Sequence, residues 1–359
     1  MRSVKARLLF AGGGSGGHVI PGLALAEALA AAGGEPFLVT GGRPVEERLA
    51  AGVPWPREVV DLEGGPLRLL RRLPLLVRAM RRTCRRRRIE GVVALGGRVG
   101  LPAALAGKSL GLPLYLLEIN GVAGRTTRVL APLARKIFNA LPAAADRLPR
   151  EKVVQSGVPL RAPFHAPPPA AEARRSLGLS PGGGPVLLVF GGSMGARSLN
   201  RIVLAELARP GRLPPGCRVL HVTGPEMVEE ARRAWRETGL ESLVFPFLAR
   251  MELALAAADL VICRGGAMTM AEVAALGRPA LVVPYPWHRD RHQELNAAPL
   301  VEQGRARLMP QERLADELAG VVGELIRSPA RLRDMAGKGR PAPGRSPAAL
   351  ILAEILGRG

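Results

Sequence analysis

The chain has 359 residues and carries 51 Lys and Arg against 30 Asp and Glu, a formal net charge of +21. The length suits two domains rather than one, and no apolar run reaches the roughly 18 residues that a membrane span needs. Three scattered cysteines, Cys84, Cys217 and Cys263, form neither a disulfide framework nor a zinc cluster. A reducing, cytoplasmic setting is therefore expected, and a secretory signal is not, because glycines interrupt the first apolar run.

The first half of the chain alternates short apolar runs with helical segments. Residues 6–12 predict a buried strand, and after a glycine-rich loop residues 23–33 predict a helix of strong helix formers that ends at Gly33. Further apolar runs that precede turns occupy residues 35–42, 91–107, 112–121 and 151–159. This alternation predicts a parallel sheet covered by helices on both faces.

The same order of strand, glycine loop and helix starts again at residues 184–208, close to half a chain length later. A Pro- and Gly-rich linker at 157–185 separates the two halves, and Ser346 and Pro347 cap a terminal helix. The sequence thus predicts an α/β protein of two Rossmann-like domains with parallel sheets facing a cleft. The expected boundaries are 1–160 and 161–340, with a C-terminal segment at 341–359 that packs back on the first domain.

Glycine loops stand at 12–17, 96–100, 191–196 and 264–269. The first has the spacing of a dinucleotide fingerprint, but no carboxylate ends the next strand, and His18 stands where a P-loop has Lys. A glycine loop before a helix still presents free N–H groups and a partial positive charge to an anion. One such loop is more simply a tight turn, whereas four at one cleft favour ligands that carry several phosphates.

The segment 264–296 has the residues expected for a nucleotide sugar. Glu272, in the first two turns of a helix, offers a carboxylate to the two hydroxyls of a ribose, and a polar stretch follows that contains His288, Asp290, His292, Gln293 and Asn296. The His/Asp/His pattern also fits a metal, but no second cluster supports that interpretation, and no metal or other cofactor is expected.

Six motifs, in order, resemble the MurG family: residues 12–29, 118–128, 156–161, 190–197, 263–286 and 292–297. The resemblance implies the GT-B glycosyltransferase architecture. It also implies an inverting N-acetylglucosaminyltransferase of peptidoglycan synthesis, which moves GlcNAc from UDP-GlcNAc to the MurNAc 4-hydroxyl of lipid I, undecaprenyl-pyrophosphoryl-MurNAc-pentapeptide, to form lipid II. The N-terminal loops would then face the acceptor diphosphate and the C-terminal loops the donor.

The resemblance also implies which residues bind the two substrates. The matching positions, from the acceptor side to the donor side, are Ser15, Gly16, Gly17, Asn120, Arg161, Ser193, Leu248, Ala267, Met268, Thr269, Met270, Glu272 and Gln293. Of these, Asn120 and Gln293 would contact the GlcNAc, Leu248 the uracil and Glu272 the ribose. Four positions depart from the family pattern: Ser15 replaces Thr but keeps the hydroxyl, Ile119 and Met194 replace Gln, and Gly265 replaces Ser. Two amide side chains are thereby lost.

The acceptor hydroxyl needs a base, and two residues compete for this role. His18 titrates near neutral pH, but the helix N-terminus disfavours its charged form, and hydrogen bonding to the acceptor is an equal alternative. Glu118 is the rival base or a buried structural carboxylate. His18 is the working hypothesis.

The densest basic tract, residues 67–90, sets Leu69, Leu73, Leu76, Val77, Met80 and Cys84 on one helical face among arginines. These leucines either pack on the sheet or meet lipid. The arginines predict reversible binding to an anionic membrane surface, hence a peripheral location on the cytoplasmic face of the cell membrane. Two alternatives remain: another UDP-sugar enzyme of this fold, such as a lipid glycosyltransferase or a UDP-GlcNAc epimerase, and a nucleic-acid-binding protein. Scarce aromatic residues make the last unfavourable, so no nucleic acid is expected.

Overall fold

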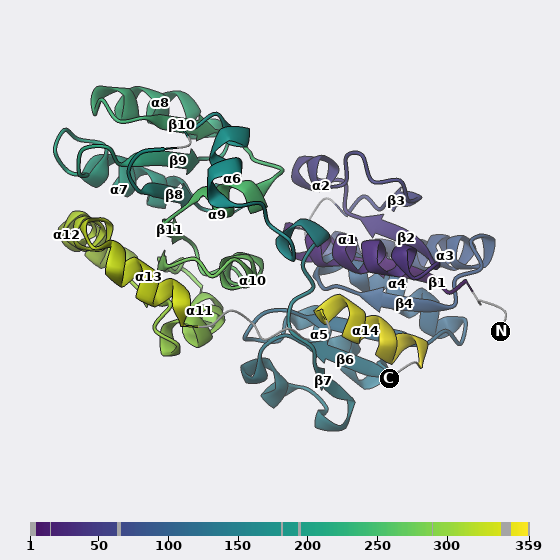
Figure 1. Cartoon of the computed structure of the whole chain (residues 1–359). Coiled ribbons are helices and arrows are strands. Elements are labelled where there is room, and N and C mark those ends of the chain that lie inside the picture. Colours follow the sequence, from purple (N-terminus) through teal and green to yellow (C-terminus); the bar gives the residue numbers. More distant parts are fainter. Residues whose placement is uncertain are drawn as a thin grey trace. The chain divides into compact units, whose positions relative to one another are not determined.

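The computed structural model describes residues 5–14, 16–62, 66–180, 182–192, 195–288, 290–338 and 346–357. Contacts divide the chain into two units, one formed by 1–162 with 345–359 and the other by 163–344. Arg161 falls in the first unit. Each unit is built on its own parallel sheet with its own core (Figure 1).

The sheet of the first unit contains seven strands among the described residues, in the order β3-β2-β1-β4-β5-β6-β7, all parallel. The strands are β1 (Arg7–Ala11), β2 (Glu35–Thr40), β3 (Arg57–Val59), β4 (Gly91–Ala94), β5 (Leu114–Glu118), β6 (Lys136–Asn139) and β7 (Val153–Gln155). The helices are α1 (Gly16–Ala31), α2 (Pro44–Leu49), α3 (Pro66–Arg86), α4 (Gly97–Ser109), α5 (Arg125–Leu130) and α14 (Pro347–Leu356), with short 3-10 turns at Ala131–Leu133, Pro142–Arg147, Arg150–Lys152 and Ala162–Phe164.

The sheet of the second unit repeats this topology with six strands in the described part, in the order β10-β9-β8-β11-β12-β13. The strands are β8 (Val186–Phe190), β9 (Arg218–Val222), β10 (Ser242–Phe245), β11 (Leu260–Cys263), β12 (Ala280–Val282) and β13 (Ala306–Leu308). The helices are α6 (Ala170–Leu177), α7 (Arg197–Leu207), α8 (Val228–Glu237), α9 (Met251–Ala257), α10 (Ala267–Ala275), α11 (His292–Glu302), α12 (Leu314–Arg327) and α13 (Pro329–Gly337), with 3-10 turns at Pro225–Met227 and Gln311–Arg313.

The central strands are mostly apolar because helices cover both of their faces. Every residue of β8, β9 and β11 is buried, and β1, β4 and β5 are buried almost throughout. The predicted α/β class with two parallel-sheet domains is confirmed. The first helix, however, begins earlier than the sequence pattern indicated, since α1 starts at Gly16, inside the glycine loop itself.

The terminal helix α14 packs beside α1 in the first unit (Figure 1). The Ser346 hydroxyl accepts the Ala349 N–H and so caps the helix start. Further along the helix, Glu354 forms an ion pair with Lys136 at the beginning of β6. The last segment of the chain therefore belongs structurally to the first unit, although nearly the whole second unit precedes it in sequence.

Candidate functional site

Both sheets change direction of strand order at one point, between β1 and β4 in the first unit and between β8 and β11 in the second. In open α/β sheets, ligands bind beyond the carboxyl ends of the strands at such a switch point. The four glycine loops found in the sequence are the loops that follow β1, β4, β8 and β11. Topology therefore places two of them at each switch point.

The first glycine loop is held by Glu46 of α2, a residue that the sequence pattern did not reveal. One carboxylate oxygen accepts the Gly14 N–H and the other the Gly41 N–H, both at 2.5 Å, and Glu46 is completely buried. The Arg43 guanidinium donates to the Gly14 carbonyl oxygen at 2.7 Å. Glu46 thus uses one of the backbone N–H donors that the glycine loop could offer to a ligand. Glu46 is also the acidic residue that follows β2, and it binds backbone N–H groups rather than a ribose. The only local signal was an acidic residue in the first turn of a helix after Pro44.

His18 is the third residue of α1, in its first turn, and lies against the loop that follows β4. Its Nδ1–H donates to the Leu95 carbonyl oxygen at 2.8 Å, because a carbonyl oxygen can only accept. Gly96 and Gly97 have φ of +92° and +70°, and a Cβ on Gly96 would lie 2.8 Å from the His18 ring. Glycine at these positions is therefore what lets the imidazole lie against the loop. Burial lowers the pKa of His18 below its ordinary value.

Glu118 ends β5 as a buried carboxylate with four hydrogen bonds. One oxygen accepts the backbone and side-chain N–H groups of Asn120 at 3.1 and 3.2 Å, and the other accepts the Gly124 N–H and the Thr127 hydroxyl, both at 2.8 Å. The carboxylate thus shapes the 119–124 loop and turns the Asn120 amide toward it. Ile119, one of the departures from the family pattern, is buried.

Arg161, expected on the nucleotide side, pairs instead with a helix of the first unit. Its Nε donates to Glu27 Oε1 of α1 at 2.7 Å, and the following Ala162 N–H bonds the other oxygen at 3.3 Å. Leu248 lies just beyond the carboxyl end of β10 and is partly buried. Gly16 and Gly17 form the first turn of α1, whereas Ser15, Ser193 and Met194 lie outside the described residues.

The helix α10 opens directly after the loop that follows β11. Its first turn consists of the buried residues Ala267, Met268 and Thr269, and the first intrahelical bond runs from the Met270 N–H to the Gly266 carbonyl oxygen. The N–H groups before Met270 have no acceptor within the helix, and free N–H groups at a helix start are suited to bind an anion.

Gln293 connects this loop to the segment before α11. Its amide oxygen accepts the Gly265 N–H at 3.2 Å and the Tyr285 N–H at 2.9 Å. A Cβ on Gly265 would lie 2.3 Å from the Gln293 carbonyl oxygen, so the close approach of the two segments excludes the Ser that the family pattern has there. The two bonds occupy the amide oxygen, and no hydrogen bond from the Gln293 Nε2 donors is found among the described residues.

Glu272 is a buried carboxyl one turn further along α10. It is 6% exposed, and no hydrogen bond to its carboxyl oxygens is found in the described part of the chain. Burial and the neighbouring Glu252 raise the pKa of Glu272 to about 8. Burying a carboxyl group without a hydrogen-bond donor costs free energy. We therefore interpret Glu272 as an acceptor for hydroxyl donors of a ligand.

Arg264, immediately before the α10 loop, is a further residue that sequence reasoning missed. It is 5% exposed and donates to the Val283 and Pro284 carbonyl oxygens and, through Nη2, to Ser198 and Gln311. No described carboxylate pairs with it, and burial lowers its pKa to about 10. This cation adds positive potential behind the α10 loop.

A buried relay supports the loop after β8. The Trp235 Nε1–H donates to His221 Nδ1 at 3.0 Å, so His221 Nε2 carries the proton and donates to Asn200 Oδ1 at 3.2 Å. The Asn200 amide in turn donates to the Thr223 carbonyl oxygen at 2.7 Å. The relay fixes α7 against the end of β9, and burial lowers the pKa of His221 to about 3.

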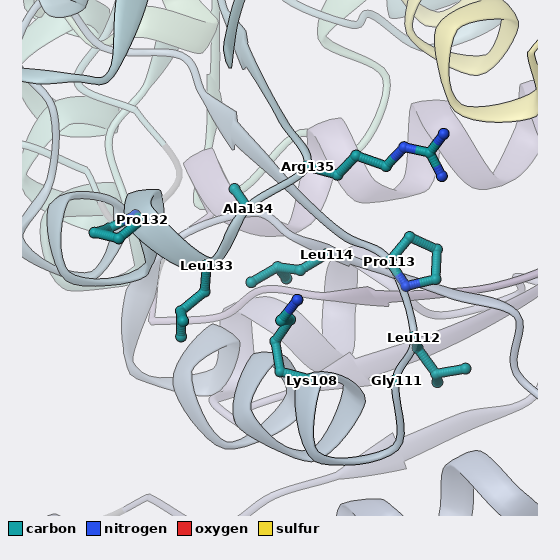
Figure 2. A pocket seen from close by; sticks show the side chains of 9 residues that line it. All are labelled: Lys108, Gly111, Leu112, Pro113, Leu114, Pro132, Leu133, Ala134 and Arg135. Atoms are coloured by element: carbon teal, nitrogen blue, oxygen red, sulfur yellow. The ribbon is translucent and has the colours of Figure 1, made fainter. Parts of the chain in front are cut away.

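Two surface hollows lie elsewhere on the first unit. One, of about 490 Å³, starts at the amino end of β5, opposite the glycine loops. Figure 2 shows the Lys108 amine pointing toward Leu114 while Arg135 extends away. The other has about the same volume and is lined by β3 and α3, including Arg57, Arg82, Arg86 and Arg87 with one acid, Glu58. Both hollows are more basic than acidic.

The structure shows which apolar side chains of α3 are buried and which are exposed, a question that the sequence left open. Met80 and Cys84 are buried, and Leu76 and Val77 pack against the same core. The exposed apolar side chains are instead Leu70 and Leu75, at 66% and 71% exposure. No helix in the described ranges is both long and apolar enough to cross a bilayer.

Comparisons with known proteins agree with this geometry. The glycosyltransferase family 28 N-terminal domain matches residues 8–139, and the C-terminal domain of the same family matches residues 186–345. The chain is 39% identical over 355 residues to the UDP-N-acetylglucosamine--N-acetylmuramyl-(pentapeptide) pyrophosphoryl-undecaprenol N-acetylglucosamine transferase of Pseudomonas paraeruginosa, with 94% of each chain covered.

Among solved structures, Acinetobacter baumannii MurG matches with a TM-score of 0.74 and 27% identity, over 99% of this chain and 100% of the other. A UDP-GlcNAc 2-epimerase from Neisseria meningitidis matches with a TM-score of 0.70, 99% of this chain and 100% of that one being covered. At 13% identity, that second likeness shows the fold alone.

Proposed function

The chain belongs to glycosyltransferase family 28, and from this premise we propose that it transfers GlcNAc from UDP-GlcNAc to the 4-hydroxyl of the MurNAc sugar of an undecaprenyl-pyrophosphoryl acceptor. Full-length relatives at 35–39% identity carry this activity in their names, whereas the epimerase likeness is limited to the fold. The structural observation that carries the donor half of the proposal is Glu272. It is a buried carboxyl to which no described residue donates a hydrogen bond, one turn into a helix whose N-terminus is open to an anion.

The second unit holds the donor in this proposal. The N-terminal turn of α10 binds the diphosphate, Glu272 accepts the ribose hydroxyls, and the Gln293 amide donates to the sugar. Leu248, at the end of β10, faces the uracil. Arg264 adds positive potential behind the diphosphate from a buried position, where charge is screened less than at the surface.

The first unit holds the acceptor. The N-terminal turn of α1, with Gly16 and Gly17, receives its diphosphate or sugar. Ser15 is proposed to bind the same part of the acceptor, although it lies outside the described residues. Asn120 meets the transferred GlcNAc. Arg161 acts through its ion pair with Glu27, which ties the end of the first unit to α1. The loop containing Ser193 contributes to donor binding in the second unit.

In the transfer step the acceptor 4-hydroxyl oxygen attacks C1 of the GlcNAc as the C1–O bond to the diphosphate breaks. UDP departs with the bonding electron pair, and the α-linked donor yields a β-linked product. The developing negative charge is stabilised by the amides of the α10 turn, so no acid is required on the leaving group. The hydroxyl proton passes to His18 Nε2, because Nδ1 is already engaged with Leu95.

Glu118 is better suited to position the acceptor than to take its proton. Four donors already occupy its two oxygens, and their common effect is to hold the 119–124 loop with Asn120. His18, by contrast, keeps a ring nitrogen whose lone pair is not used in a hydrogen bond within the described chain.

The surface of α3 would bring the enzyme to its lipid-linked acceptor. Leu70 and Leu75 are exposed among arginines, and the two hollows at α3 and at Lys108 are basic. Such a surface attracts anionic lipid headgroups and buries a small apolar area, which gives reversible peripheral binding at the cytoplasmic face of the membrane.

The proposal is tested by incubating the purified chain with UDP-GlcNAc and a lipid I analogue. We expect release of UDP together with an acceptor product heavier by one GlcNAc, and no reaction when the analogue lacks its MurNAc 4-hydroxyl. Conversion of UDP-GlcNAc to an isomer without any acceptor would instead support the epimerase alternative.

A further inference from the structure

His288, Asp290 and His292 come together in the turn that precedes α11. One potential ligand atom from each residue lies within 4.8 Å of the other two, and this is the one such group of three found among the described residues. The centroids of the two imidazole rings are 4.3 Å apart, and the His292 Nδ1–H donates to Asp290 Oδ1 at 2.7 Å. Two of the five histidines of the chain thus meet at a single carboxylate.

The backbone of the turn brings these alternate residues together. The Arg291 N–H donates to the His288 carbonyl oxygen at 3.1 Å, and Arg291 has φ 48° and ψ 26°, in the left-handed region. Non-glycine residues rarely adopt this conformation. The Asp290 carboxylate also accepts the His292 N–H at 3.3 Å, which closes the turn.

Two imidazoles and one carboxylate are the ligand set of Zn²⁺ and its first-row neighbours, whereas Mg²⁺ and Ca²⁺ prefer oxygen alone. His288 and Asp290 are exposed, so water can complete the coordination. We propose that this turn is an open site for a first-row transition-metal ion of the Zn²⁺ class, held by His288, Asp290 and His292. The site does not depend on the proposed transferase activity.

The position of the site gives it a structural consequence. His292 is the first residue of α11 and precedes Gln293, whose amide oxygen joins the Gly265 and Tyr285 N–H groups. The centroid of the His288 ring lies 5.0 Å from the centroid of the Tyr285 ring. A bound ion therefore cross-links His288, Asp290 and His292 beside this junction and stabilises the folded second unit by mass action.

The test uses the full chain prepared without a histidine tag and freed of metal by chelation. Co²⁺ is titrated and followed by its visible absorption, Zn²⁺ is followed by calorimetry, and Mg²⁺ serves as the ion that the site should reject. We expect one Co²⁺ or Zn²⁺ per chain and a thermal unfolding temperature that rises with the concentration of the ion.

The variants His288→Ala and Asp290→Asn should each weaken Co²⁺ affinity by at least about tenfold, since loss of even an outer-shell partner costs about 10–100-fold. The matched control is His165→Ala, an exposed histidine of the second unit, which should leave the affinity unchanged. Unfolding temperatures of the metal-free variants report whether they fold. Saturable binding absent below about 1 mM, a loss smaller than tenfold in both variants, or an equal loss in the control would overturn the site.

Discussion

The Nδ1–H of His18 and the carbonyl oxygen of Leu95, 77 positions apart in sequence, are joined by a 2.8 Å hydrogen bond. This bond decides the tautomer of the imidazole, because the nitrogen that donates must carry the proton and the other nitrogen keeps its lone pair. Burial lowers the pKa of the ring and so favours the neutral form. Both effects prepare Nε2 to accept a proton.

The first prediction concerns this base. His18→Ala should lower kcat by about 10²–10⁴-fold with a smaller change in KM, because a general base acts mainly in the transition state. In the wild type, activity should fall only below the ordinary pH range of histidine, since protonation of a ring with a lowered pKa requires more acid. Steady-state kinetics from pH 5 to 9 measure both. A variant that keeps more than about a tenth of wild-type kcat would remove His18 from this role.

Glu118→Gln separates positioning from proton transfer at the rival residue. The new amide group places N–H donors against the Gly124 N–H or the Asn120 amide, so the 119–124 loop should loosen and the free energy of unfolding fall by about 1–3 kcal/mol. We expect the KM for the acceptor to rise. The fall of activity at low pH should occur at the same pH as in the wild type. Loss of that fall in Glu118→Gln, with stability unchanged, would identify Glu118 as the base instead.

Donor binding should release a proton through Glu272. With a pKa of about 8 the carboxyl is mostly protonated at pH 7, and hydroxyl donors from a ribose favour its ionised form. UDP-GlcNAc binding at pH 7 should therefore release up to about one proton, measured by calorimetry in buffers that differ in ionisation enthalpy. Both phosphates of UDP-GlcNAc are diesters and do not titrate in this range.

The control is Glu272→Gln, which should abolish the proton release and weaken donor binding by about 1.5–3 kcal/mol, the contribution of a hydrogen bond to a charged group. Proton uptake on binding, or release that persists in Glu272→Gln, would contradict the assigned role.

Because His221 is buried and hydrogen-bonded to Trp235, the stability of the second unit should decrease at acid pH. His221 has a folded-state pKa of about 3 against an ordinary value of 6.5, so the unfolded chain binds its proton first as the pH falls. Stability is therefore full above pH 6.5 and decreases between 6.5 and 3, by up to about 1.4 kcal/mol per pH unit. Denaturant unfolding at pH 7 and pH 5 should show a larger loss in the wild type than in His221→Gln. Parallel losses in both proteins would show that other groups dominate.

Membrane binding should depend on the exposed leucines of α3. Leu70→Ser with Leu75→Ser should weaken binding to vesicles that contain anionic phospholipid by at least about tenfold, since each exposed leucine that enters lipid contributes about 1.5–3 kcal/mol. Leu295→Ser, an exposed leucine of the second unit, is the matched control. Binding should also weaken as salt rises from about 0.1 to 0.5 M, and salt-insensitive binding would count against the arginines.

Much of the architecture could be predicted from local patterns. The order of apolar strand, glycine loop and helix, repeated at half a chain length, predicted two parallel-sheet domains, and Ser346 with Pro347 predicted the start of α14. The start of α1 at Gly16 was not predicted, because glycine has a low helix propensity, which the packed helix overrides here.

The partners of the polar side chains were beyond local patterns. Glu46 binds a glycine loop 32 positions earlier, and Arg264 reaches Gln311, 47 positions later. On α3, periodicity placed six apolar residues on one face but could not say which of them the core would cover.

The sequence by itself determined which segments form strands, helices and phosphate-type turns, because apolar periodicity and glycine conformations act over a few residues. Only the tertiary structure decided which nitrogen of His18 is free, that the oxygens of Glu118 are occupied, and that no described residue donates to the Glu272 carboxyl. Those properties follow from burial and from hydrogen bonds between residues that only the packed sheets bring within 3 Å or so of one another.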